Sequence, residues 1–113
     1  MKLMDTEIKV VEPSGILNNS VASQLCREVN EVIQAGTRLV LVDLQAVTFI
    51  DSSGLGGLVN AFKLARAAGS RLVLCSVCDQ ARMLFEITGM DQIFEIFPSR
   101  SEFDRALAIA NLV

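Results

Sequence analysis

The stretch Ile50-Asp51-Ser52-Ser53-Gly54-Leu55-Gly56-Gly57 follows an apolar run and opens a helical pattern, and the rest of the chain is organised around it. One acidic residue and two hydroxyl-bearing residues stand where the helix should begin. The first turn of a helix exposes N–H groups that have no partner within the helix, so this position favours negative charge. The three glycines lower helix propensity and remove side chains, and we therefore predict that another molecule can approach the backbone closely here.

Helix capping is the simplest alternative explanation for Asp51, Ser52 and Ser53, because Asp and Ser are good N-cap residues. A cap needs only one such residue, whereas here three precede glycines that weaken the helix. The stretch lacks the spacing of a phosphate-binding loop, and no lysine follows before Lys63. A serine nucleophile would need a base, and the chain contains no histidine. These features favour a contact site and predict no catalytic residues.

The composition limits the remaining functional classes. The 113 residues suit one compact domain, which we place at 1–113. Charges and glycines interrupt the apolar runs before they reach membrane-spanning length, and the first residues do not lead into a signal region, so we expect a cytoplasmic protein without membrane insertion. The net charge of −3 and the scarcity of aromatic residues argue against nucleic acid as a partner.

The three cysteines predict neither a cofactor nor a metal site. Cys26, Cys75 and Cys78 cannot complete a zinc site of cysteine and histidine, although a carboxylate could supply a fourth ligand. Cys75 and Cys78 have the C-x-x-C spacing of a redox pair. Cys75 also continues the strand pattern of Leu72-Val73-Leu74, where a thiol usually serves as a small hydrophobic group. We predict a structural role for both cysteines, with a small thiol redox enzyme as the alternative.

Hydrophobic periodicity predicts an α/β fold. Near-alternating or continuous apolar runs indicate about five strands, and stripes with a spacing of three and four residues indicate about four helices. We expect one mixed β-sheet packed with these helices, with the first two strands forming a hairpin before the first helix. The expected strands lie at 7–12, 16–17, 39–42, 71–76 and 93–97, and the expected helix caps are Asn18 to Ser20, Asp51, Asp79 and Ser101.

The segment Asp51-Ser52-Ser53-Gly54-Leu55-Gly56, placed after a buried strand that ends in Asp43, resembles the signature of the STAS domain family, specifically of the bacterial anti-sigma factor antagonists. The resemblance extends over nearly the whole chain and implies a single STAS domain that is not an enzyme. The other matching segments are Gly15-Ile16-Leu17, Val42-Asp43-Leu44, Ala65-Arg66, Gly69 and the segment from Leu84-Phe85 to Gly89.

The resemblance also implies a function and its partners. In this family the first serine of the pair is phosphorylated by a partner that is both a serine kinase of the histidine-kinase-like ATPase type and an anti-sigma factor. The unphosphorylated form binds that partner and frees the sigma factor, and a serine phosphatase is a further implied partner. Carried over, the phosphorylated residue is Ser52. The expected partner-binding residues are Asp51, Ser53, Gly54, Leu55, Gly56 and Gly57.

Asn18 is a departure from the family pattern, which commonly has an aspartate at this position. The missing charge leaves the fold intact and bears on phosphorylation or partner contacts. The family also includes domains fused to anion transporters and members that serve lipid transport, the stressosome or other signalling complexes without sigma factor control. These alternatives remain open at the level of sequence.

Overall fold

Strands and helices alternate along residues 8–111, which are the residues that the computed structural model describes. Buried apolar stripes and capping residues set most of their limits. In chain order the elements are β1 (Ile8–Val11), β2 (Gly15–Leu17), α1 (Asn19–Gln34), β3 (Leu39–Asp43), β4 (Val47–Ile50), α2 (Ser52–Ala67), β5 (Arg71–Cys75), α3 (Asp79–Thr88), the short 3-10 helix η2 (Met90–Gln92), β6 (Glu95–Phe97) and α4 (Arg100–Asn111).

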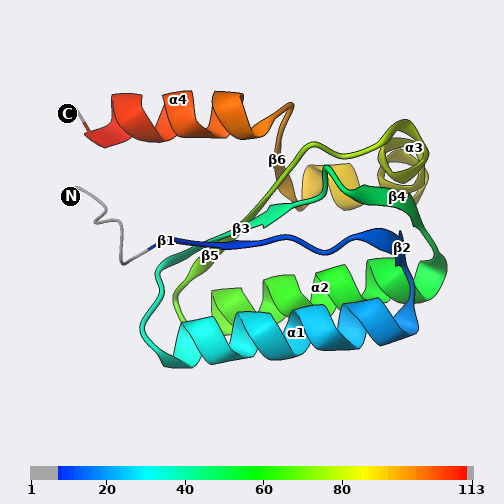
Figure 1. The fold of residues 1–113 in the computed structure, drawn as a ribbon, viewed down its shortest axis with the longest axis horizontal. Helices are drawn as coiled ribbons and strands as arrows, with labels where there is room; N and C mark the ends of the chain where they lie inside the picture. Colours follow the sequence, from blue (N-terminus) through cyan, green and yellow to red (C-terminus); the bar gives the residue numbers. More distant parts are fainter. Residues whose placement is uncertain (1–7, 112–113) are drawn as a thin grey trace.

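The strands form two sheets. The larger sheet has the order β1-β3-β5-β6, the smaller one pairs β2 with β4, and every one of these pairs is parallel. Figure 1 shows α1 and α2 along one face of the larger sheet and α4 along the other. The sheet is therefore a middle layer, as expected when strands alternate with helices.

The central strand β3 explains how one sheet supports two cores. Its residues are all buried, and successive side chains point to opposite faces. Val40 and Val42 belong to the main core, which includes buried residues of α1 and α2. A smaller core on the other face gathers Leu39, Leu41, Val73, Cys75 and Phe103, the last of which comes from α4.

The predicted α/β class with four helices is confirmed, whereas the prediction of one mixed sheet of about five strands is wrong. Residues 8–111 contain six strands in two parallel sheets. The predicted hairpin is also wrong, because β1 pairs with β3 and β2 pairs with β4. The strand that we had not predicted is β4. It follows a tight turn in which Asp43 Oδ1 accepts a hydrogen bond from the N–H of Gln45 (3.0 Å) and Leu44 O accepts one from the N–H of Val47 (3.0 Å).

Candidate functional site

Two helices begin side by side at the end of the smaller sheet. Leu17 and Ile50, the last residues of β2 and β4, are register partners, and the residue after each is the N-cap of a helix. Asn18 Oδ1 accepts a hydrogen bond from the N–H of Val21 (3.1 Å) at the start of α1. Asp51 Oδ1 accepts one from the N–H of Gly54 (2.7 Å) at the start of α2, and the N–H of Asp51 donates to Leu17 O (3.3 Å). Both helices thus direct their positive ends to the same edge of the molecule.

Ser52 and Ser53 form the exposed start of α2. Among residues 8–111, neither hydroxyl takes part in a side-chain hydrogen bond, so both are available to another molecule. The N–H of Gly54 is not free, because it donates to Asp51 Oδ1. The N–H groups of Ser52 and Ser53 remain as the first donors of the helix that have no intrahelical acceptor.

The glycines of the motif serve two different purposes. A methyl group on Gly54 would overlap the carbonyl oxygen of Leu17, and one on Gly57 would overlap the Cβ of Ala22. These two glycines therefore let α2 approach β2 and α1 closely. Gly56 is exposed, and a side chain there would meet open space.

The sequence predicted an open backbone at all three glycines. The backbone is open at Gly56, whereas Gly54 and Gly57 are in close contact with β2 and α1. Leu55 also faces inward, with 9% of its surface exposed. The predicted partner residues that remain on the surface are Asp51, which is half-buried, Ser53 and Gly56. All three lie within four residues of Ser52 at the start of α2.

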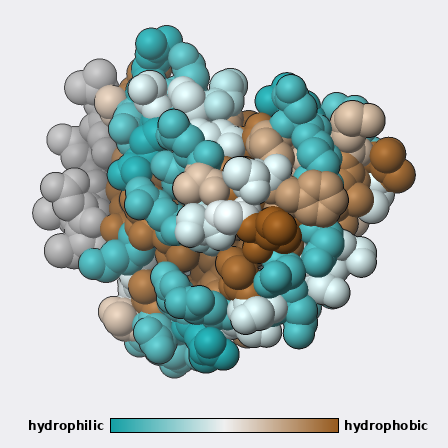
Figure 2. Space-filling model, turned by 45° about the vertical axis from the view of Figure 1, so that its right-hand side comes forward, coloured by the Kyte–Doolittle hydropathy of each residue, from teal (hydrophilic) through white to brown (hydrophobic). Residues whose placement is uncertain are grey.

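An exposed apolar pair lies next to this helix start. Ile16 on β2 and Phe49 on β4 are 54% and 45% exposed. They are register partners, so their side chains project from the same face of the smaller sheet. Figure 2 shows hydrophobic residues at the surface on the side of the molecule that carries β2, β4 and α3. Sequence reasoning missed Phe49 as a surface residue because it had not identified β4 as a strand.

The cysteines occupy separate structural positions. Cys75 is buried in the smaller core, and burial raises the pKa of its thiol from 9.0 to about 11. Cys78 packs against the main core, and its thiol donates a weak hydrogen bond to Thr48 O (3.7 Å). All three cysteines of the chain are free thiols. A thiol with a raised pKa is a poor nucleophile near neutral pH, so the arrangement agrees with a structural role rather than with redox chemistry.

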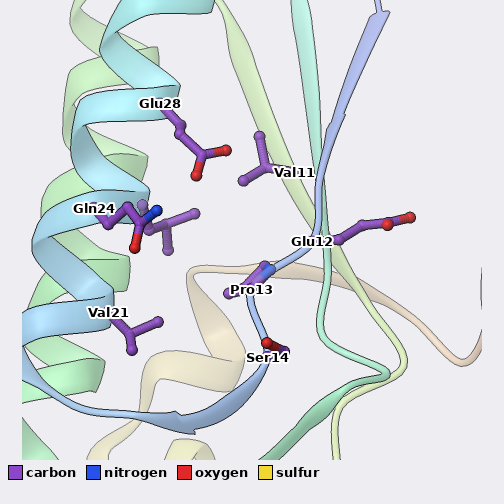
Figure 3. A pocket seen from close by; sticks show the side chains of 8 residues that line it. Val11, Glu12, Pro13, Ser14, Val21, Gln24 and Glu28 are labelled. Atoms are coloured by element: carbon purple, nitrogen blue, oxygen red, sulfur yellow. The ribbon is translucent and has the colours of Figure 1, made fainter.

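A pocket of about 190 Å³ lies between α1 and the segment that follows β1. Figure 3 shows the side chains of Gln24 and Glu28 pointing from α1 toward the strand, whereas Glu12 points away. The volume is below that of ordinary ligand pockets, and the carboxylate of Glu28, which points into the pocket, would repel a phosphate. This pocket therefore does not resemble a nucleotide site.

Residues 8–111 contain neither a metal-binding cluster nor a membrane-spanning helix. No set of three His, Cys, Asp or Glu side chains in that range is arranged to hold a metal ion. In the same range, no helix has the length and apolar character needed to span a bilayer.

Comparison with known proteins identifies relatives of this chain. The family model described as "STAS domain" matches residues 3–103. The chain is 46% identical over 97 residues to the anti-sigma-B factor antagonist of Listeria monocytogenes, an alignment that covers 85% of this chain and 84% of that protein.

Solved structures share the fold. The unphosphorylated form of the anti-sigma factor antagonist SpoIIAA superposes with a TM-score of 0.73 at 20% identity, covering 93% of this chain and 92% of that one. A sulfate transporter family protein from Wolinella succinogenes superposes with a TM-score of 0.79 at 23% identity, covering 98% of this chain and 90% of that one. At these identities the two structures show a common fold.

Proposed function

Since the chain belongs to the STAS domain family, we propose that it is an anti-sigma factor antagonist whose binding is switched by phosphorylation of Ser52. The unphosphorylated chain binds a serine kinase of the histidine-kinase-like ATPase type that also acts as an anti-sigma factor, and so frees a sigma factor. Phosphorylation releases the kinase, and a serine phosphatase restores the binding form. The similarity to the Listeria antagonist over most of both chains supports this proposal.

The observation that carries the proposal is the position of the Ser52 hydroxyl. It is exposed at the start of α2, beside the cap Asp51 and three residues after the exposed Phe49. The pair formed by Ile16 and Phe49 offers a partner apolar area, and clusters of this kind commonly supply much of the binding energy of an interface. A neutral hydroxyl can be buried beside such a pair at modest cost when it finds a hydrogen-bond partner.

A phosphate on Ser52 changes this balance. It adds about −1.5 to −2 units of charge at pH 7. The free chain tolerates the group, because the N–H groups of Ser52 and Ser53 and the positive end of α2 lie beside it. In the complex the phosphate would lose water next to Phe49 and the Asp51 carboxylate, and an unpaired buried charge opposes binding strongly.

The chain acts in this scheme as a substrate and a binding partner, not as an enzyme. The Ser52 oxygen attacks the terminal phosphorus of ATP held by the kinase, the bond from that phosphorus to the bridging oxygen of ADP breaks, and the serine proton passes to the kinase. This chain supplies only the positioned hydroxyl. We assign this role to one domain over residues 1–113 and place it in the cytoplasm.

The experiment that tests the proposal is phosphorylation of the full chain by a serine kinase recovered from the native lysate on the immobilised wild-type chain. We expect mass spectrometry to place one phosphate on Ser52 in the wild type and in the matched Ser53→Ala control, and none in Ser52→Ala. Phosphate on another residue, or phosphorylation of Ser52→Ala at the wild-type rate, would contradict the assignment.

A further inference from the structure

The side chain of Gln80, in the first turn of α3, forms two hydrogen bonds with the backbone of Ile50. Its Oε1 accepts a hydrogen bond from the N–H of Ile50 (2.8 Å), and its Nε2 donates to Ile50 O (2.8 Å). The two bonds satisfy both backbone groups of the last residue of β4. The amide therefore takes the place that a neighbouring strand would occupy.

A second contact with this edge of β4 comes from Cys78, the N-cap residue of α3. The thiol of Cys78 donates to Thr48 O, two residues before Ile50. Residues 48 and 50 present their backbone groups on the same side of the strand, because these groups alternate along it. The other side of β4 pairs with β2. The strand thus pairs with β2 on one side and contacts the side chains of Cys78 and Gln80, at the start of α3, on the other.

Ile50 directly precedes the cap of α2 and the proposed phosphorylation site. Its side chain is buried, and the next residue is Asp51, whose carboxylate caps α2 through the N–H of Gly54. Ser52 follows as the first residue of the helix. Any rotation of the Ile50 peptide therefore changes the direction in which the chain enters the cap and the serine.

We propose that Gln80 is a positioning residue for Ser52, acting through the backbone of Ile50. This inference rests on the proposed function of Ser52 as a phosphate acceptor. Phosphoryl transfer depends on the placement of the attacking oxygen, and a displacement of about 1 Å can lower the rate about 100-fold. A primary amide suits this role because it supplies one acceptor and one donor together, whereas a carboxylate supplies acceptors only and a thioether almost none.

Hydrogen exchange tests the positioning without any partner. We compare the wild type with Gln80→Met, which keeps the length of the side chain and removes both bonds, and with Gln34→Met, the same change at an exposed glutamine in the last turn of α1. The amides of Ile50 and Gly54 should exchange about tenfold faster in Gln80→Met, which corresponds to the loss of a typical hydrogen bond. The amides of β3 should keep their protection in all three proteins. Unchanged exchange at Gly54 would overturn the proposal, because the bonds of Gln80 would then order Ile50 without affecting the cap of α2.

Phosphorylation kinetics test the consequence for Ser52, with the kinase recovered on the wild-type chain. We expect kcat to fall about tenfold in Gln80→Met while KM stays within about twofold, because Gln80 is not one of the proposed contact residues and the placement of the hydroxyl is the main change. Gln80→Glu, which keeps one acceptor, serves as a second variant if Gln80→Met does not fold, and it should also lower kcat. An unchanged kcat in a folded variant would overturn the proposal. If the wild type is not phosphorylated at Ser52, the proposed function fails, and the exchange at Gly54 then decides whether Gln80 positions the cap.

Discussion

Asn18 and Asp51 hold equivalent positions, because each directly follows one member of the register pair Leu17 and Ile50 and each caps a helix. One cap is a neutral amide and the other is a carboxylate. The edge where both helices begin therefore carries one acidic cap, whereas the family pattern commonly has an aspartate at the position of Asn18 as well.

The first prediction concerns this charge difference. Asn18→Asp should keep the cap of α1, since both residues are good caps, and the free energy of unfolding of the unphosphorylated chain should change by less than about 1 kcal/mol. The phosphorylated form should be destabilised relative to wild type, because a second carboxylate then stands near the phosphate. Urea denaturation of both forms at low and high salt measures the difference, which should shrink as salt rises. An equal effect of phosphorylation on both proteins would contradict the proximity of Asn18 to Ser52.

The second prediction separates the glycines of the motif. Gly57→Ala should destabilise the fold by about 1–3 kcal/mol, because the added methyl overlaps Ala22 where α1 and α2 meet. Gly56→Ala should be neutral or stabilising by up to about 1 kcal/mol, since its methyl meets open space and alanine favours the helix. Urea denaturation of the two variants checks this order. Equal stability would show that the helices do not pack closely at Gly57.

The third prediction tests the open side of α2 as part of the interface. Gly56→Arg should leave the melting temperature within a few degrees, because the position is exposed, and should reduce kinase binding strongly through a steric clash. Isothermal titration calorimetry measures the binding. Wild-type affinity in this variant would place the interface elsewhere.

The fourth prediction tests the apolar pair. Phe49→Ala should weaken kinase binding by about 2 kcal/mol or more, as expected for an aromatic anchor, and should change folding stability by less than about 1 kcal/mol. Ile109→Ala is the matched control, because Ile109 is also an exposed apolar residue but lies on α4, on the other face of the larger sheet. Its affinity should equal that of the wild type. Similar losses in both variants would show that binding does not depend on the smaller sheet.

The fifth prediction follows from the buried thiol. The pKa of Cys75 is raised from 9.0 to about 11 in the folded chain, so the unfolded chain loses this proton at lower pH. The contribution of Cys75 to stability is therefore complete below pH 9.0 and should decline as the pH rises toward about 11. Cys75→Ala should be less stable at neutral pH because packing is lost, and its stability should decline less over this alkaline range. A parallel decline in both proteins would contradict burial of the thiol.

Hydrophobic periodicity predicted most of the helices and strands, because each of these elements has its own local pattern of apolar residues. The continuous apolar run of β3 and the apolar stripe of α1 could be identified from the order of apolar and polar residues alone. The strand β4 could not, because its pairing with β2 joins residues far apart in the chain, and because it is short and directly follows the turn after Asp43. The hairpin expected before α1 was wrong for the same reason.

The candidate site was predictable in part. The Asp51 cap and the exposed serines follow from local sequence preferences, and the structure places them as expected. The inward orientation of Gly54 and Gly57 depends on how closely α2 packs against Leu17 and Ala22, which no local pattern shows. The contact of Gln80 with Ile50 depends on the position of α3 beside β4, so it could not be predicted from the sequence either.

The most direct test of the central claim is the affinity of the kinase for the same chain with and without phosphate on Ser52, measured by calorimetry with circular dichroism as the check on folding. We predict that phosphorylation lowers the affinity by orders of magnitude while the spectrum stays the same, that Ser52→Asp fails to bind, and that Ser52→Ala binds like the unphosphorylated wild type. If Ser52 served only as part of a helix cap, Ser52→Asp and the phosphorylated chain would bind the kinase as tightly as the unphosphorylated wild type, and that result would contradict the switch.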